Sequence, residues 1–124
     1  MDMVEEGLAR LVTVDAIDLN VVAETTLFTC PTGKICIISH IVLRNLDGAL
    51  ATASVSFGWN TGEADDVIAN GVLALTGATN YEIVKAESDA VRGVAAGTFK
   101  IDVQTGEGGA LTGSVDVFGY LIDA

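Results

Sequence analysis

Apolar and polar residues alternate with a period of two along most of this sequence, which restricts the fold more than any other feature. In residues 52–59 one set of alternate positions is apolar, namely Ala53, Val55, Phe57 and Trp59. Residues 99–104 and 115–121 alternate in the same way. Such alternation predicts antiparallel strands with one buried and one solvated face, and no segment shows helical spacing. We therefore expect an all-β protein.

One segment, residues 35–44, is apolar at both sets of alternate positions. Its odd positions are nearly all aliphatic, and its even positions include Ile38 and Val42. A strand that is apolar on both faces is typical of the centre of a sheet, or of a strand whose second face is covered by a neighbouring subunit. We expect this segment to be a central strand.

Weaker strand patterns and turn-forming residues complete the chain. The weaker patterns lie at residues 10–14, 25–30, 72–75 and 80–86. Turn residues separate the strands at 31–34, 45–48, 60–66, 76–77 and 106–109. Many short strands at this spacing predict a sandwich or barrel, and about eight of them would form a jelly roll. We expect one antiparallel β-sandwich of jelly-roll type over residues 9–124, after an N-terminal arm or disordered end at residues 1–8.

The sequence is strongly acidic, with 17 Asp and Glu residues, 6 Lys and Arg residues and a formal net charge of −11 at pH 7. Nucleic acids and anionic membranes are bound mainly through Lys and Arg, so the charge argues against both partners. The charge leaves a basic protein surface, a divalent cation or an uncharged glycan open as partners, or it serves solubility alone. The acidic N-terminal residues, with no apolar segment after them, argue against a signal peptide. We expect synthesis in the host cytoplasm and reduced cysteines.

Residues suited to catalysis are few. His40 is the only histidine, which excludes sites built from several imidazoles, and its place in an apolar strand favours a structural role. Cys30 and Cys36 flank the turn at residues 31–34, for which two hairpins are open. A two-residue loop puts the sulfurs on opposite faces, and a three-residue loop with a left-handed Gly33 puts them diagonally on one face, a poor start for a disulfide. We expect two buried thiols, no catalytic residues, no cofactor and no enzymatic activity.

The acidic loop at residues 60–66 is the best candidate for a small binding site. Hard cations take several oxygen ligands, and four side chains of the loop offer them: Asn60, Glu63, Asp65 and Asp66. Their spacing differs from that of an EF-hand, so we expect a solvated loop and keep calcium as the alternative. The glycine-rich residues 106–109 contain Glu107 and lack the lysine of a phosphate-binding loop, and we interpret them as a hairpin turn.

The last strand pattern predicts an apolar surface. If Val115, Val117 and Leu121 face inward, three large side chains face outward: Phe118, Tyr120 and Ile122. Such a group exceeds what a monomer usually leaves exposed. A subunit interface would cover it, and so would another part of the same chain, such as residues 1–8. Our hypothesis is the subunit interface, with Ile38 and Val42 as a second candidate group.

Two segments resemble small proteins of bacteriophage particles. Residues 26–34 end in a turn with Pro31, Gly33 and Lys34, and an aliphatic strand then runs to Asn45. Residues 115–122 are similar to the terminal strand of the same proteins, which are β-sandwich or jelly-roll domains in capsid decoration, head-fibre and tail positions. Cys30 stands where a valine is more usual. The resemblance covers about a quarter of the chain, and its motifs are structural.

The resemblance implies a structural role at the virion surface. The expected function is a capsid decoration (cement) protein or similar accessory subunit that forms a homo-oligomer, with a trimer as the first expectation, and binds a larger shell or tail assembly. The alternative is a lectin-like or receptor-binding module of a tail or fibre. In that case Trp59, Tyr81 and Tyr120 would stack on sugars, and the loop at residues 60–66 would hold calcium.

Overall fold

The computed structural model describes residues 7–72, 81–87 and 90–124, and every regular element in these ranges is a β-strand. In chain order the strands are β1 (Ala9–Asp18), β2 (Glu24–Thr29), β3 (Lys34–Arg44), β4 (Ser54–Gly58), β5 (Ile68–Val72), β6 (Glu82–Lys85), β7 (Thr98–Thr105) and β8 (Thr112–Asp123). The prediction of an all-β chain is confirmed. Nothing in the described ranges is a helix long and apolar enough to cross a membrane.

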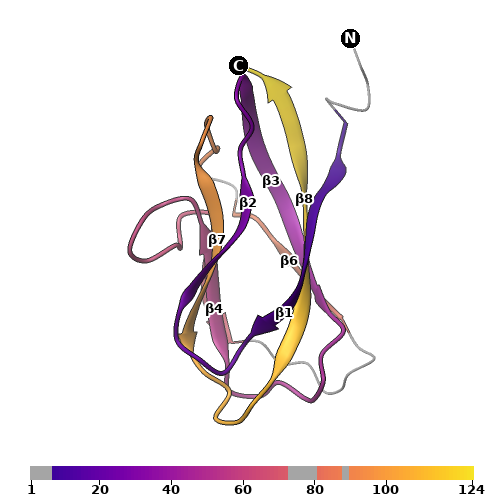
Figure 1. Cartoon of the computed structure of the whole chain (residues 1–124), viewed down its shortest axis with the longest axis vertical. Helices are drawn as coiled ribbons and strands as arrows, with labels where there is room; N and C mark the ends of the chain where they lie inside the picture. Colours follow the sequence, from indigo (N-terminus) through magenta and orange to yellow (C-terminus); the bar gives the residue numbers. More distant parts are fainter. Residues whose placement is uncertain (1–6, 73–80, 88–89) are drawn as a thin grey trace.

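The strands form two antiparallel sheets that pack face to face (Figure 1). Sheet A has the order β1-β8-β3-β6, and sheet B has the order β2-β7-β4-β5. Each strand of the first half therefore pairs with its counterpart in the second half, β1 with β8, β2 with β7, β3 with β6 and β4 with β5. This nesting is that of a long hairpin rolled into a sandwich, which is the eight-stranded jelly roll.

Two connections that we expected to be hairpins cross between the sheets instead. Residues 30–33 join β2 of sheet B to β3 of sheet A, and residues 106–111 join β7 to β8 in the same sense. Gly33 has the expected left-handed conformation, with φ of +79°, and the Lys34 N–H donates to the Pro31 carbonyl at 3.2 Å. The hairpin prediction is wrong because a tight turn fixes only the reversal of the chain. The choice of strand partner comes from pairing elsewhere in each sheet.

The core lies between the sheets. Phe57 of β4 and Phe99 of β7 stack there, with ring centroids 6.2 Å apart, and Val115 and Val117 of β8 are fully buried against them from sheet A. The inward alternation predicted for these strands is confirmed.

The other face of β4 is also buried, contrary to the expected solvated face. Ser54 and Ser56 are 4% and 0% exposed. Two neighbours cover this row of small residues: Gln104 of β7 donates from Nε2 to Ser56 Oγ at 2.9 Å, and Asp66 lies over Gly58. A Cβ at Gly58 would come 2.1 Å from an Asp66 carboxylate oxygen, so the loop at residues 59–66 rests directly on the sheet. The small polar residues of β4 therefore belong to a strand whose second face is covered by other parts of the chain.

Strand β3 is central in sheet A, between β8 and β6, as its composition predicted. A bulge in β3 changes which set of alternate positions faces the core. Ile38 pairs with Gly119 and His40 with Phe118, so Ser39 is an extra residue in the ladder. Before the bulge the even positions Cys36 and Ile38 face the core, and after it the odd positions Ile41 and Leu43 do. The expected outward position of Ile38 is therefore wrong, since this side chain is 5% exposed and belongs to the core.

Several expectations fall wholly or partly on residues outside the described ranges, including the turn at residues 76–77 and the first residue of the strand predicted at residues 80–86. The strand predicted at residues 72–75 overlaps β5 only at Val72, because β5 begins earlier, at Ile68, and residues 73–75 are not described. Residues 1–6 of the expected N-terminal arm are likewise outside these ranges, and β1 begins at Ala9.

The close approach of β8 and β3 at the bulge gives a test of this fold. A Cβ at Gly119 would lie 2.3 Å from the Ile37 carbonyl oxygen, so we expect Gly119→Ala to lower the free energy of unfolding by about 1–3 kcal/mol. Gly109→Ala is the control, because a Cβ there meets no atom within 4 Å, and we expect a change within about 0.5 kcal/mol. Urea unfolding measures both, and equal stability of the two variants would contradict the register.

Candidate interaction surface

The outward side of sheet A has an apolar part that runs over three strands. Cross-strand pairing brings Ile35 opposite Ile122 and Ile37 opposite Tyr120, and on the other edge of β3 it brings Val42 opposite Ile83. Phe118 lies next to Tyr120 in this row, two positions along β8. We call this surface the outer apolar face; it consists of Ile35, Ile37, Val42, Ile83, Phe118, Tyr120 and Ile122.

The outer apolar face is accessible in the described chain. Ile37 is 42% exposed and Ile83 is 51% exposed, and the other five side chains are half-buried by one another. The face thus includes the three residues of β8 and one of the two β3 residues that we singled out as interface candidates. Residues 1–6, which we considered as a cover within the same chain, lie outside the described ranges.

His40 belongs to the same side of the sheet and has a structural environment. Its ring stacks flat on Phe118, with centroids 4.7 Å apart and an interplanar angle of 6°, and its Nδ1 is 3.0 Å from Ser39 Oγ. The stack shields one face of Phe118 from water and fixes the orientation of both rings.

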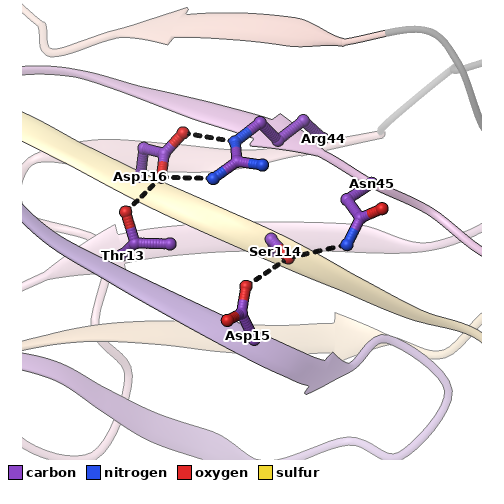
Figure 2. A network of polar contacts seen from close by, with 6 residues as sticks. All are labelled: Thr13, Asp15, Arg44, Asn45, Ser114 and Asp116. Atoms are coloured by element: carbon purple, nitrogen blue, oxygen red, sulfur yellow. Dashed lines mark hydrogen bonds and ion pairs between the residues drawn. The ribbon is translucent and has the colours of Figure 1, made fainter.

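Beyond the apolar part, the outward side of sheet A is polar and is centred on Asp116 of β8 (Figure 2). Arg44 of β3 donates from Nε to Asp116 Oδ2 at 2.6 Å and from Nη2 to Oδ1 at 3.1 Å. Thr13 of β1 donates from its hydroxyl to Oδ1 at 2.6 Å. One carboxylate therefore ties the side chains of three adjacent strands together.

A second, weaker group continues this network along β8 (Figure 2). The Ser114 hydroxyl donates to Asp15 Oδ1 at 2.7 Å and accepts a hydrogen bond from Asn45 Nδ2 at 3.4 Å. These contacts again join β1, β8 and the end of β3. The network fixes the relative position of the strands that carry the outer apolar face.

The electrostatic state of Asp116 follows from its partners. The side chain is only 7% exposed, and the hydrogen bonds from Arg44 lower the pKa of Asp116 below its ordinary value, with the Thr13 hydroxyl adding to the effect and burial opposing it. A lowered folded-state pKa means that the charged form stabilises the fold above the unfolded-state pKa. This stability is lost as the pH falls through the folded-state pKa.

The candidate calcium ligands do not converge. Asn60 and Asp65 bond to each other, through Asn60 Oδ1 with the Asp65 N–H at 3.1 Å and Asn60 Nδ2 with Asp65 Oδ1 at 3.3 Å. Asp66 Oδ1 instead accepts from the Trp59 N–H at 2.6 Å. Among the described residues no three His, Cys, Asp or Glu side chains form a group that could hold a metal. The structure thus gives Asn60, Asp65 and Asp66 a role in closing the loop on sheet B, whereas the Glu63 side chain is exposed.

The aromatic residues of the lectin alternative are also separated. Trp59 packs its indole against Phe99 in the core, with centroids 5.3 Å apart, and its ring fills the space beside Gly93. Tyr120 lies on the outer apolar face, and Tyr81 is exposed before β6. Trp59 therefore follows a strand of sheet B, whereas the two tyrosines lie in or next to strands of sheet A.

One carboxylate that holds the fold together was missed by sequence reasoning. Glu107, in the β7–β8 connection, accepts hydrogen bonds from the backbone N–H groups of Ala51, Thr52 and Ala53, the shortest at 2.6 Å. The backbone bonds from Thr52 and Ala51 lower the pKa of Glu107 from its ordinary value. No local signal marks this role, because the partners lie more than fifty positions earlier in the chain.

The network around Asp116 can be tested by removing its charge. We expect Asp116→Asn to lower the free energy of unfolding by about 1–3 kcal/mol at pH 7, because the ion pair with Arg44 is lost in a largely buried position. The difference from the wild type should shrink as the pH falls, because acid protonates Asp116 in the wild type as well. Asp15→Asn is the control, since Asp15 is exposed and accepts one hydrogen bond in Figure 2, from Ser114. Denaturant unfolding between pH 7 and pH 3 measures these effects, and an Asp116→Asn penalty independent of pH would contradict the assignment.

Comparisons with known proteins identify the fold and no family. No protein-family model matches the sequence, and no curated protein matches it. Among solved structures, the chain is similar to one from the acidic stable capsid structure of Helicobacter pylori bacteriophage KHP30. The two are 13% identical with a TM-score of 0.51, and the superposition covers 96% of this chain and 98% of the other. At this level of identity the likeness shows that the two chains share their fold along nearly their whole length.

Proposed function

We propose that this chain is a structural subunit of a bacteriophage particle, a capsid decoration protein or similar accessory subunit that acts by packing against other subunits. The observation that carries the proposal is the outer apolar face, which places seven large apolar side chains on one side of a rigid sheet. Surfaces of this kind on soluble proteins mark sites of association. The proposal assigns the chain no reaction and no cofactor.

The fold likeness supports this setting. The similar chain comes from a bacteriophage capsid, and the superposition spans both chains almost completely. Jelly rolls occur in capsid proteins and in lectin domains, so the fold by itself allows either role. The packing of the half-buried Trp59 against Phe99 and the closed loop at residues 60–66 favour the capsid role, because both parts of a lectin site are engaged in the fold.

The mechanism we propose is the removal of the outer apolar face from water between subunits. Complete burial of an Ile, Phe or similar side chain contributes roughly 1.5–3 kcal/mol, and these side chains are already partly covered, so each contributes less than this. A stable interface buries roughly 1,200–2,000 Å² in total, so the interface would also include polar residues around the outer apolar face. Assembly would then stabilise both the subunit and the shell by mass action.

The net charge of the chain predicts how salt affects its binding to each kind of partner. Copies that each carry −11 repel one another, so added salt should strengthen self-association by screening. Contact with a basic shell surface would instead weaken in salt. Our first expectation is a homo-oligomer, with three copies, that sits on a larger assembly at the virion surface.

A pair of opposed side chains in the outer apolar face provides the test. Ile37 and Tyr120 face each other across β3 and β8, and both point away from the core, so Ile37→Ser with Tyr120→Ser should leave the fold intact. We expect the wild type to form oligomers and the double variant to sediment as a folded monomer of 12.8 kDa, with self-association weakened at least about tenfold. Sedimentation velocity at two salt concentrations and circular dichroism measure this.

The matched control is Val21→Ser with Val22→Ser. These residues are 54% and 63% exposed in the β1–β2 connection. This connection lies at the opposite end of the sandwich from the start of β3 and the end of β8 (Figure 1). We expect this variant to assemble like the wild type. An unchanged oligomer mass in the Ile37/Tyr120 variant, or a wild type that remains monomeric at millimolar concentration, would overturn the proposal.

A further inference from the structure

The two cysteines of the chain meet inside the sandwich, although they come from different sheets. Cys30 follows the last residue of β2 in sheet B, and Cys36 is the third residue of β3 in sheet A. Their sulfurs are 2.9 Å apart, with the Cys36 thiol donating to Cys30, and the two residues are 1% and 0% exposed. Neither of the two hairpin arrangements that we considered for the turn occurs, because β2 and β3 belong to different sheets.

The backbone holds both cysteines in place through one segment, residues 93–97. Cys36 exchanges both of its backbone hydrogen bonds with Gly93, at 2.9 and 2.8 Å. Cys30 donates to the Gly97 carbonyl at 2.8 Å and accepts from the Ala96 N–H at 3.0 Å. The segment itself rests on Trp59, whose ring leaves no room for a Cβ at Gly93. The sulfurs are therefore neighbours in a frame that backbone hydrogen bonds hold in place.

We propose that Cys30 and Cys36 are a site of covalent modification, an intramolecular disulfide that forms when the chain meets an oxidising environment and fastens sheet A to sheet B. The sulfur separation exceeds a disulfide bond by about 0.9 Å, a distance within the reach of small χ1 rotations. The inference is independent of the proposed function, because it concerns the stability of the subunit alone.

The reaction is thiol–disulfide exchange with a small-molecule disulfide as oxidant. One cysteine thiolate attacks a sulfur of oxidised glutathione and expels one glutathione thiolate, which leaves a mixed disulfide. The second cysteine thiolate then attacks the protein sulfur of that mixed disulfide and expels the second glutathione. Two electrons and two protons pass from the protein to the reagent, and one S–S bond is broken for each one formed.

Burial controls the rate in both directions. Desolvation raises the pKa of Cys36 far above its ordinary value, and the hydrogen bond with Cys30 adds to the shift, so little thiolate is available in the folded chain. Oxidation should be fast while the chain folds and slow afterwards. The same burial would shield the finished disulfide from reducing agents.

The bond should stabilise the chain to a moderate degree. It closes a short loop, from residue 30 to residue 36, so the constraint on the unfolded state is small. It also links the two sheets at the end where the turn and residues 93–97 connect them. We expect the melting temperature of the oxidised chain to exceed that of the reduced chain by about 5–10 °C.

The test uses the wild-type chain refolded from urea in a buffer of oxidised and reduced glutathione, and the folded chain incubated in the same buffer. Iodoacetamide added in denaturant then labels any free thiol, and intact mass counts the labels. We expect the refolded chain to lose two hydrogens in mass, to take no label and to melt at the higher temperature. The folded chain should reach the same product more slowly, and the product should resist dithiothreitol until urea is added.

Two thiols that remain free after refolding, or glutathione adducts and linked dimers as the only products, would overturn the proposal. The variant with Cys30→Ala and Cys36→Ala is the control for the melting shift, and its melting temperature should not respond to glutathione. If this variant does not fold, the mass of the wild-type chain decides the question by itself.

Discussion

The pairing of β8 with both β1 and β3 is the interaction on which the rest of the structure depends. The last strand lies between the first strand and the third, and its residues 112–119 pair with β1 while residues 114–123 pair with β3. Each neighbour has one extra residue near Phe118: β1 between Arg10 and Val12, and β3 between Ile38 and His40. The two bulges decide which side chains enter the core on either side of this level. A slip of one residue in β8 would turn its apolar row outward and its acidic residue inward.

This register explains why one side of sheet A has two kinds of surface. Around Asp116 the strands are tied through charged and hydroxyl groups that satisfy one another. Beyond Phe118, β3 and β8 carry paired apolar side chains outward, and Val42 with Ile83 extends the apolar part beside Asp116. The polar part makes the sheet stiff, because Thr13, Arg44 and Asp116 come from three strands and share one carboxylate. A stiff sheet keeps the apolar part in one arrangement before it meets a partner, which lowers the entropy lost on association.

The sequence was sufficient for the class of fold and for the position of β3, and insufficient for details that depend on distant pairing. Alternation reports which residues share a face, so the inward rows of β4 and β8 were predictable. The bulge at Ser39 was hidden, because residues 35–44 are apolar at both sets of positions and either set fits the core. The turn at residues 31–34 has the same local chemistry whether it closes a hairpin or crosses between sheets. Ser54 and Ser56 look solvated in sequence, and only the Gln104 side chain and the Asp66 loop make them buried.

The position of the cysteines relates the interior of the sandwich to its outer apolar face. Cys36 points inward between Ile35 and Ile37, which point outward from the same stretch of β3, opposite Ile122 and Tyr120. A bond from Cys36 to Cys30 would therefore anchor the apolar part of sheet A to sheet B directly behind the surface that we propose for association. Such a bond adds no contact to that surface and changes none of its side chains. It would act on assembly only by restricting the motion of β3, so an oxidised subunit should associate through the same face with less loss of entropy.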